Sequence, residues 1–390
     1  MRINALYVIV KLVERCNLKC SYCYYYTADN AEVYERPALM ASGHLDDLLT
    51  FVEQARRDTP FPRVVFGFHG GEPTLAKAAH VRRFCLEARR RLEPELSVGF
   101  SLQTNGVHLS DDWLALLAEQ RMGVGISIDG PKDIHDRYRM DHRDRGSHDR
   151  VRHTLSRLLP LDEGGLIHLT ALAVMGDDFS GVPSYRHLVE DLGVRRIKLL
   201  FVDRTADEPW SGADQDRLAS FLCDTFDYWL THHRDSVEVI FFETVIRGLL
   251  AARHGIRGDR SRITMGFALL SDGRIRIQDD FMVATDWFWS QRDLAIAHAT
   301  LDDYLGQPHL EALVGSLIEA PAACAGCVYA DSCAGGEVAH RYTRARGFEN
   351  RSVYCQALTA FYRHVDERLL GGEARLREDR ADVDDGVLVA

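Results

Sequence analysis

Apolar and polar positions follow a regular order over roughly the first 200 residues of the chain. Runs of β-branched and other apolar residues, typical of buried strands, are each followed by a segment with apolar residues at three- and four-residue spacing, typical of an amphipathic helix. The strand-like runs cover residues 5–13, 63–68, 97–103, 124–128, 166–174 and 196–202. This alternation predicts a parallel sheet with right-handed crossovers. Six units suit an incomplete barrel better than an eightfold one, so we expect an α/β fold with a partial, TIM-like (β/α)6 barrel.

The pattern changes after residue 235. The run 237–242 (VEVIFF) predicts another strand, and the step Asp272-Gly273 predicts the turn of a β-hairpin. We therefore expect three parts, namely a barrel over residues 1–235, a smaller α+β domain over residues 236–368, and a flexible acidic tail over residues 369–390.

Composition narrows the functional class. Hydrophobic residues make up 46% of the chain and charged residues 27%, as in a globular protein, and the net charge of −11 argues against nucleic acid as a partner. The sequence has no apolar run of membrane-spanning length and no signal-peptide pattern, which predicts a cytoplasmic protein without a membrane partner. Seven of the nine cysteines fall in two groups, which indicates metal binding rather than disulfides, whereas Cys85 and Cys223 stand apart and are expected in the core.

The first cysteine group follows the first predicted strand directly. Cys16, Cys20 and Cys23 can hold three irons of a cubane cluster and leave the fourth iron open, whereas iron–sulfur clusters normally take four cysteines. A structural zinc site is the alternative, although zinc usually takes four ligands and no nearby fourth ligand is obvious. Polar motifs also end the later strands, at residues 69–73, 104–106 and 129–131. The C-terminal ends of parallel barrel strands meet at one face, so these motifs are expected around one site.

The spacing Cys-x3-Cys-x-Tyr-Cys, with Tyr22 before the last cysteine, resembles that of radical S-adenosylmethionine (SAM) enzymes. This resemblance implies a [4Fe–4S] cluster that binds SAM and a 5′-deoxyadenosyl radical that abstracts a hydrogen from the substrate. It assigns Tyr22 to the adenine, the Gly70–Pro73 segment with Glu72 to the ammonium group, and Ser127 and Arg139 to the ribose and carboxylate. Leu200 would pack on the adenine. The SAM-binding candidates are therefore Tyr22, His69, Gly70, Gly71, Glu72, Asn105, Ser127, Arg139 and Leu200.

Each of these assignments has a simpler alternative. The Gly70–Pro73 segment could be an ordinary tight turn, Arg139 could be a solvated charge on the surface, and Leu200 could belong to the core.

The second cysteine group resembles the C-terminal SPASM domain of radical SAM maturases. Its members are Cys324, Cys327, Cys333 and Cys355. The family pattern has further cysteines at positions occupied here by Gln278 and Glu337, so the resemblance implies one auxiliary [4Fe–4S] cluster that transfers electrons or supports the fold. A four-cysteine zinc site is the alternative.

The resemblance also suggests a substrate class. The Arg36-Pro37 segment and the missing auxiliary ligands are similar to the cyclophane-forming branch, which predicts a maturase that crosslinks a ribosomally made precursor peptide. The alternative is oxidation of Cys or Ser to formylglycine, as in anaerobic sulfatase maturases. A different class, a non-catalytic iron–sulfur or zinc scaffold, would require the SAM motifs to be incidental. Expected partners are the precursor peptide and a flavodoxin- or ferredoxin-type electron donor.

Forming either product requires a proton acceptor near the substrate radical. In sulfatase maturases an aspartate follows the hairpin cysteine, and the matching residue after Gln278 is Asp279, which we predict to be the catalytic base. The alternative is that Asp279 and Asp280 form a solvated turn pair beyond the hairpin.

Overall fold

The fold is built on one curved sheet. In the computed structural model, residues 2–27, 30–176, 180–208, 210–256 and 262–370 are described. The strand order is β10-β9-β8-β1-β2-β3-β4-β5-β6-β7. The strands are β1 (Arg2–Val13), β2 (Arg63–Gly70), β3 (Ser97–Thr104), β4 (Gly123–Ser127), β5 (His168–Met175), β6 (Arg196–Phe201), β7 (Glu238–Val239), β8 (Arg262–Leu269), β9 (Arg274–Arg276) and β10 (Leu294–Ala295).

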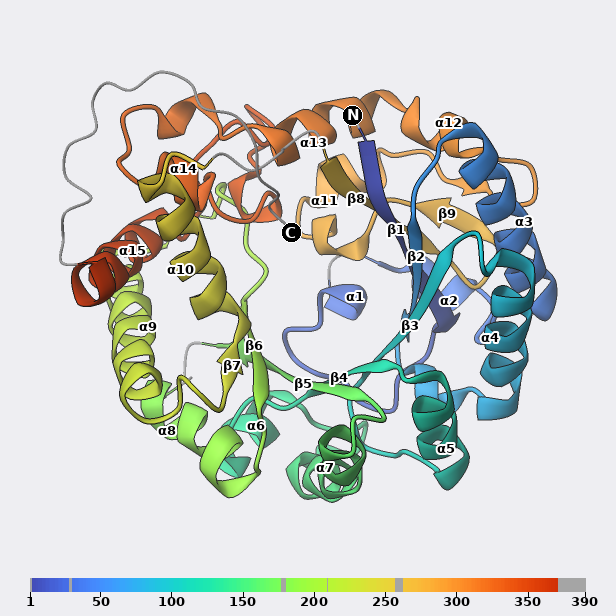
Figure 1. Ribbon diagram of the computed structural model, residues 1–390, viewed down its shortest axis with the longest axis horizontal. Coiled ribbons are helices and arrows are strands. Elements are labelled where there is room, and N and C mark those ends of the chain that lie inside the picture. Colours follow the sequence, from blue (N-terminus) through green and yellow to red (C-terminus); the bar gives the residue numbers. More distant parts are fainter. Residues whose placement is uncertain (1, 28–29, 177–179, 209, 257–261, 371–390) are drawn as a thin grey trace.

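The central strands pair in parallel, as predicted. β1 pairs with β2, and the order continues strand by strand to β6 and β7 without a reversal. Figure 1 shows the sheet curving around the short helix α1 (Tyr24–Thr27), with its two ends unjoined. The predicted α/β fold with an incomplete barrel is therefore confirmed.

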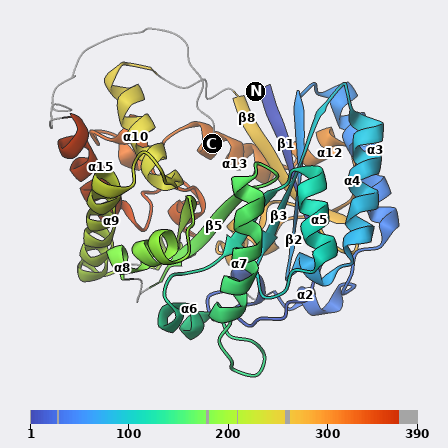
Figure 2. The ribbon, with the colours of Figure 1, turned by 60° about the horizontal axis from the view of Figure 1, so that its bottom comes forward.

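Helices cover the outer face of the curve (Figures 1 and 2). They begin where the sequence offers caps: the Ser110 hydroxyl, for example, accepts the backbone N–H of Trp113 at the start of α5. The longer helices are α3 (Ser42–Asp58), α4 (Ala78–Leu92), α5 (Asp111–Gln120), α7 (His148–Glu163), α9 (Gly212–His232), α10 (Ile240–Arg253), α13 (Pro308–Ile318) and α15 (Cys355–Leu370). The shorter ones are α2 (Glu32–Glu35), α6 (Lys132–Tyr138), α8 (Gly181–Arg186), α11 (Thr285–Trp289), α12 (Leu301–Leu305) and α14 (Ala330–Cys333).

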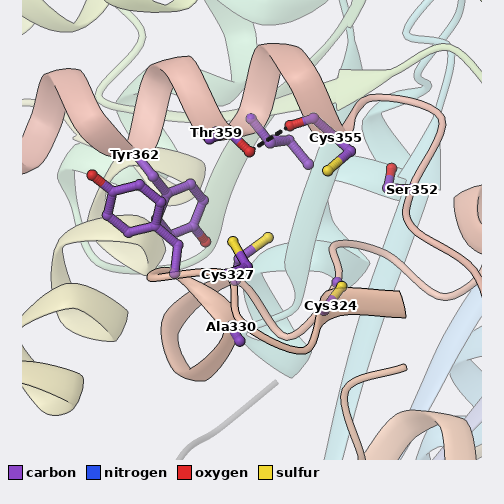
Figure 3. Close-up of a pocket in the computed structure, with 11 residues that line it drawn as sticks. Cys324, Cys327, Ala330, Ser352, Cys355, Thr359 and Tyr362 are labelled. Atoms are coloured by element: carbon purple, nitrogen blue, oxygen red, sulfur yellow. Dashed lines mark hydrogen bonds between the residues drawn. The ribbon is translucent and has the colours of Figure 1, made fainter. Parts of the chain in front are cut away.

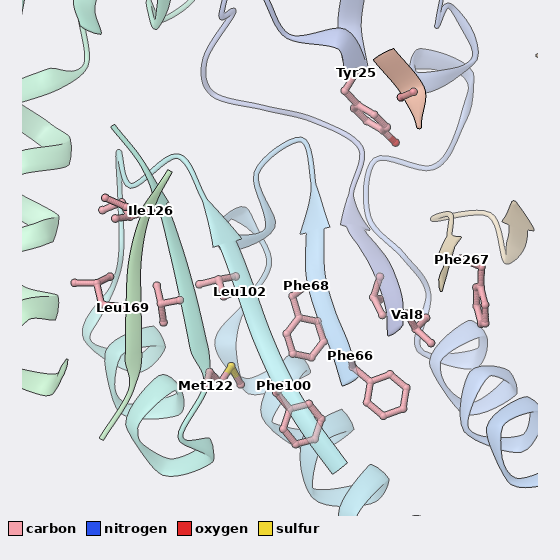
Figure 4. Packing of buried hydrophobic residues seen from close by; sticks show 14 of the residues in the cluster. Val8, Tyr25, Phe66, Phe68, Phe100, Leu102, Met122, Ile126, Leu169 and Phe267 are labelled. Atoms are coloured by element: carbon pink, nitrogen blue, oxygen red, sulfur yellow. The ribbon is translucent and has the colours of Figure 1, made fainter. Parts of the chain in front are cut away.

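The core lies between the sheet and the outer helices. In Figure 4, Phe66 and Phe68 of β2 stand beside Phe100 of β3, and both β2 rings stack on the Phe100 ring. Val8 of β1 and Phe66 are fully buried. Burial of one such phenylalanine contributes about 1.5–3 kcal/mol, so this layer fixes the strands whose ends carry the polar motifs.

The second half of the chain continues the same sheet. β8 pairs with β1 in parallel, and β9 turns back antiparallel to β8 through the predicted hairpin, where Gly273 has a φ of +81°. The strand predicted over residues 237–242 is wrong after Val239, because Phe242, Val245 and Leu249 recur at helical spacing and are buried on one face of α10. The domain boundary at residue 235 stays a prediction, and the predicted tail lies outside the described residues from 371 onward. No described helix is both long and apolar enough to cross a membrane.

Candidate active site and auxiliary cysteine pocket

The loop with Cys16, Cys20 and Cys23 connects β1 to α1 at the C-terminal end of the parallel strands. It runs against the end of α6 (Lys132–Tyr138) and the segment that follows it. The backbone N–H of Lys19 donates to the Met140 carbonyl at 2.8 Å, and the N–H of Ser21 donates to the Tyr138 carbonyl at 3.0 Å. The cysteines are therefore held by a part of the chain more than a hundred residues away.

Asn105, from the end of β3, clamps the start of this loop. Its Nδ2 donates to the Cys16 Sγ at 3.5 Å and to the Asn17 Oδ1 at 2.7 Å. The Leu18 N–H donates to the same sulfur at 3.4 Å, and His142 Nε2 lies 2.9 Å from the Cys16 carbonyl oxygen. Asn105 was predicted at this site, but its contact is with the cysteine loop.

The three thiols fit a cluster site by their chemistry. Burial, reinforced by the neighbouring thiols, raises the pKa of Cys16 to about 12 and that of Cys23 to about 11. Burial also raises the pKa of Cys20, although the nearby Arg139 guanidinium opposes the rise. The thiols influence one another because they lie close together. Iron binding would replace their protons and remove the cost of burying thiolates.

Tyr22 and Arg139 meet at Asp129. The Tyr22 hydroxyl donates to Asp129 Oδ2, and Arg139 pairs with both carboxylate oxygens at 2.8 and 3.2 Å. The Val174 N–H donates to Oδ1 at 3.0 Å. Arg139 is only 7% exposed, so the alternative of a solvated surface charge is wrong. The sequence analysis placed the 129–131 segment at the site but gave Asp129 itself no role, although it lies inside the Ser-x-Asp-Gly motif that contains Ser127.

Burial and the Arg139 charge act in opposite directions on this acid. Burial would raise the pKa of Asp129, but Arg139 outweighs it and holds the pKa below the ordinary value. The guanidinium also lies 5.3 Å from the centre of the Tyr22 ring. The result is an ionised pair beside the aromatic residue of the cysteine motif.

Gly70 and Gly71 are required by packing against the cysteine loop. A Cβ on Gly70 would lie 2.3 Å from the Val13 carbonyl oxygen, and one on Gly71 would lie 2.3 Å from the Arg15 carbonyl oxygen. The Gly71 N–H donates to Val13 and the Glu72 N–H to Arg15. The two glycines therefore allow β2 to reach the loop, a reason that the sequence analysis did not foresee.

Glu72 is buried and its carboxylate is engaged by the protein itself. Oε1 accepts the Thr74 N–H, the Thr74 hydroxyl and the Thr104 hydroxyl, and Oε2 accepts the Asn105 N–H at 2.7 Å. Burial raises the pKa of Glu72 despite these bonds. The carboxylate thus ties the end of β2 to that of β3, and its predicted contact with the SAM ammonium group stays a prediction.

The remaining SAM candidates lie on neighbouring strands. Ser127, at the end of β4, accepts the Gln103 side-chain N–H at 3.2 Å. Leu200 lies near the end of β6, opposite Val174 of β5, and is half-buried. His69 is at 3.3 Å from the ammonium of Lys11, and burial lowers its pKa well below the ordinary value. The roles assigned to these three residues stay predictions.

Asp279 forms a buried ion pair with Lys11. The two side chains are 2% and 0% exposed, and the Lys11 ammonium also lies 4.1 Å from the centre of the Tyr25 ring. The alternative of a solvated turn is therefore wrong for Asp279. Its role as base stays a prediction, and the pair with Lys11 was not foreseen because the partner is 268 positions earlier in the sequence.

Asp280 differs from its neighbour because it is exposed. Loss of hydration among the surrounding protein, together with the Asp279 charge, raises the pKa of Asp280. Burial and the charges of Asp280 and Glu337 raise the pKa of Asp203 to about 7. Burial raises the pKa of Tyr24, the residue after Cys23, and the charges of Asp279, Asp280 and Asp203 raise it further. A group of acids therefore lies beside the first cysteine loop.

The second cysteine group lines one cavity (Figure 3). Cys324 and Cys327 come from a tight loop, Cys333 ends α14 and Cys355 begins α15. Tyr329 and Tyr362 complete the wall. Burial and the Cys355 thiol raise the pKa of Cys333 to about 11, although backbone N–H groups of Gly335 and Gly336 oppose the rise.

The two cysteine groups can be compared with the ligand needs of zinc and of iron–sulfur clusters. All nine cysteines are free thiols. Within the described ranges, no three or more His, Cys, Asp or Glu side chains converge closely enough to hold a single ion. Zinc needs four ligands about 2.0–2.3 Å from one centre, whereas a cubane places each thiolate on a different iron and so needs a wider set. Sulfur is the donor that iron–sulfur clusters take, and both groups offer it through free thiols.

Comparison with known proteins agrees with this chemistry. Residues 10–162 match the family described as the Radical SAM superfamily. The cysteine-type anaerobic sulfatase-maturating enzyme of Clostridium novyi is 24% identical over 354 residues, which cover 89% of this chain and 91% of the relative. The serine-type enzyme of Bacteroides thetaiotaomicron is 24% identical over 385 residues, which cover 92% and 89%.

Solved structures show the same fold. The structure described as native anSMEcpe with bound AdoMet has a TM-score of 0.77 at 22% identity and covers 94% of this chain and 98% of its own. The form with bound AdoMet and Kp18Cys peptide has a TM-score of 0.76 with the same identity and coverage.

The matched region contains the loop with Cys16, Cys20 and Cys23, the Gly70–Pro73 segment and the Asp129–Arg139 pair. The four cysteines of the second group add the SPASM-type set in the C-terminal part. The chain therefore contains a radical SAM domain over residues 10–162, with SAM and an iron–sulfur cluster as the cofactors of that domain.

Proposed function

We propose that this enzyme oxidises a residue within a peptide or protein substrate. The observation that carries the proposal is the coexistence of a three-cysteine loop at the open end of the barrel with a four-cysteine pocket in the same chain. Relatives that share this length of sequence act as sulfatase-maturating enzymes, and one structural neighbour holds a bound peptide.

We place SAM beside the first cysteine loop. Cys16, Cys20 and Cys23 would hold the cluster, Tyr22 would face the adenine, and Ser127 and the Asp129–Arg139 pair would face the polar groups. When bound and reduced, cluster and SAM supply the radical that takes a hydrogen atom from the substrate. The chain's own residues position that substrate and exclude water around it.

Formylglycine, formed from Cys or Ser, is the product that the comparisons favour. The sulfatase-maturating relatives match over about nine-tenths of both chains. From Ser, this conversion removes a hydrogen atom, a proton and an electron and gives the aldehyde directly. From Cys, the same losses give a thioaldehyde, which water converts to the aldehyde with release of hydrogen sulfide. In both cases the second cysteine pocket could accept the electron.

An intrapeptide crosslink of the cyclophane type is the second candidate. It is favoured by the positions at which the resemblance expects further cysteines, because Gln278 and Glu337 are not thiols. Gln278 is half-buried and Glu337 is exposed, and Glu337 contributes to the acidic group around Asp203. Electron removal through a single auxiliary cluster would then serve either product.

The proton that the substrate loses would be accepted by a carboxylate of the Asp279-Asp280 turn. Asp279 is the predicted base, and it forms a buried ion pair with Lys11. Asp280 lies on the open side of the same turn. Both carboxylates are therefore tested as the catalytic base. Neither is expected to be needed for SAM cleavage.

A flavodoxin- or ferredoxin-type donor would reduce the first cluster. A cytoplasmic site of action fits this need, because reducing compartments keep cysteines free for metal binding.

The test is product analysis after anaerobic reconstitution with iron, sulfide, SAM and a chemical reductant. Candidate peptides are taken from small reading frames and sulfatase genes next to the gene of this enzyme. Formylglycine reacts with a hydrazide probe, whereas a crosslinked peptide does not and resists fragmentation inside the ring. Reductive SAM cleavage without change in any peptide would contradict the proposed substrate class.

A further inference from the structure

His135 lies in the middle of the short helix α6, directly behind the Asp129–Arg139 pair. Its side chain is completely buried. Nδ1 accepts the Asp129 backbone N–H at 3.3 Å, and Nε2 lies 2.9 Å from the Ser147 hydroxyl oxygen. The Ser147 hydroxyl in turn donates to the Arg139 carbonyl oxygen at 2.7 Å. One imidazole thus connects the backbones of both members of the pair.

These bonds define the protonation of the ring. Nδ1 must be unprotonated because it accepts an N–H. The hydroxyl proton of Ser147 is used on Arg139, so its oxygen must accept from a proton on Nε2. A neutral ring also suits its surroundings, since burial and then the Arg139 charge lower the pKa of His135 to about 3.

We propose that His135 is a positioning residue of the SAM site, which holds Asp129 and Arg139 at the places where they meet Tyr22. The ion pair closes across α6, a helix of seven residues. The backbone bonds of that helix fix Arg139, whose N–H donates to the His135 carbonyl at 2.9 Å, and they extend back to the Pro131 carbonyl, two residues after Asp129. The imidazole supplies the remaining connection to Asp129 from inside. Its effect falls on the affinity for SAM rather than on the radical step, because it reaches the site only through Asp129 and Arg139.

The inference rests on the placement of SAM beside Tyr22 and Arg139. Arg139→Gln tests that placement separately: a lost SAM affinity supports it, and an unchanged affinity would refute the placement itself. Only after that result do the His135 variants test the positioning role.

The experiment measures SAM binding to the anaerobically reconstituted enzyme by calorimetry, with iron content and cluster absorbance as checks. His135→Ala removes both hydrogen bonds and should raise the SAM dissociation constant roughly 10-fold or more. The loss of one hydrogen bond of ordinary strength corresponds to about a fivefold change in affinity. The rate of 5′-deoxyadenosine formation at saturating SAM should change less than about 2-fold, as expected for lost binding alone.

Two conservative variants separate the bonds. The Oδ1 of His135→Asn can replace Nδ1 as acceptor for Asp129, and the amide of His135→Gln can replace Nε2 as donor to Ser147. Both should bind SAM with affinities between those of the wild type and His135→Ala. Equal weakening in all three variants would overturn the hydrogen-bond explanation.

The matched control is His340→Gln, which alters another buried imidazole, 3% exposed, in the C-terminal part. It should leave SAM affinity unchanged, and an equal loss there would overturn the inference. If His135→Ala does not fold, Ser147→Ala removes the Arg139 connection alone and should weaken SAM binding about 3- to 5-fold. An unchanged affinity in folded Ser147→Ala or His135→Ala would likewise refute the positioning role.

Discussion

The two cysteine groups are built in opposite ways. The first is a partly buried loop held from outside. Asn105, directly after β3, bonds the Cys16 sulfur, His142 reaches the loop backbone, and the end of α6 and the residues after it pair with the loop. The second closes on itself, with four cysteines from neighbouring segments around one cavity walled by Tyr329 and Tyr362. The first group has charged neighbours at contact distance, whereas the second is lined mainly by thiols, aromatic rings and small residues.

The difference follows from the number of ligands. Four thiolates satisfy four irons, so a short segment and one helix end are sufficient to complete the second site. Three thiolates leave one iron open, and its ligand must be oriented by residues from other strands. The first site therefore needs the whole end of the barrel, and the second needs only its own segment.

Removal of each cysteine set should produce the largest and most asymmetric effects. The triple variant Cys16→Ala, Cys20→Ala and Cys23→Ala should abolish SAM cleavage and reduce iron from about eight to about four atoms per chain, as the thiolate count implies. Cys324→Ala with Cys327→Ala and Cys333→Ala should lose a similar amount of iron but still cleave SAM. Iron analysis and 5′-deoxyadenosine assays measure both.

Cys85→Ala and Cys223→Ala are the matched controls, since these thiols belong to neither set. They should retain all the iron. Zinc in the second site, or iron for only one cluster in the wild type, would contradict the claim that each cysteine group holds an iron–sulfur cluster.

Variants of Asp279 and Asp280 test whether product formation can be separated from cluster binding and SAM cleavage. Asp279→Asn should keep both clusters and SAM cleavage but form product at least ~100-fold more slowly, the usual scale for a lost general base. It should also destabilise the fold by about 3–5 kcal/mol, because Lys11 is left buried without its partner. Product assays and thermal unfolding measure the two effects.

Adding Lys11→Met to Asp279→Asn removes both charges and separates these effects. Stability should recover while product formation stays slow. Asp280→Asn is the companion variant, since its exposed carboxylate makes no such pair. A slow Asp280→Asn enzyme together with a normal rate for Asp279→Asn would assign the base to Asp280.

The sequence predicted the frame of the molecule well because strand and helix periodicities are local. The six strand–helix units, the hairpin at Gly273 and both cysteine groups were all readable from spacing. The segment 237–242 was misread because a short apolar run fits a strand or a buried helix, and packing of Phe242 against Phe361 of α15 decides between them.

The contacts inside the site were less predictable, because they join residues distant in sequence. Nothing near Asp279 indicates Lys11. The sequence placed Asn105 at the site but did not indicate its bond to Cys16. Glu72 shows the same limit, since its motif suggested a ligand contact while its carboxylate binds Thr74, Thr104 and Asn105. The role of His135 became visible only once α6 had brought Asp129 and Arg139 together.

The hydrogen bond from Asn105 to Cys16 should affect only the first cluster. Asn105→Ala removes an N–H donor to a sulfur ligand, and such donors favour the reduced, more negative cluster. A bond worth about 1 kcal/mol corresponds to roughly 40 mV for a one-electron couple, so the potential of the first cluster should fall by about that amount. Potentiometric titration followed by electron paramagnetic resonance measures both clusters, and an equal shift in the second one would contradict the separation of the sites.

The smallest expected effect concerns Asp203, whose half-buried carboxyl is influenced by Asp280 and by Glu337, four residues after Cys333. Its pKa is raised from an ordinary value near 4 to about 7, by burial first and then by these charges. An acid whose pKa is higher in the folded state stabilises the fold at low pH, and this contribution is lost as the pH rises from about 4 through about 7. Asp203→Asn removes the titration, so its melting temperature should match that of the wild type at pH 5 more closely than at pH 8, where the variant should be about 2 °C more stable. Thermal unfolding at the two pH values, with the exposed Asp207→Asn as control, measures the difference. An Asp203→Asn advantage that does not grow with pH would show that the pKa of Asp203 is not raised in the folded protein.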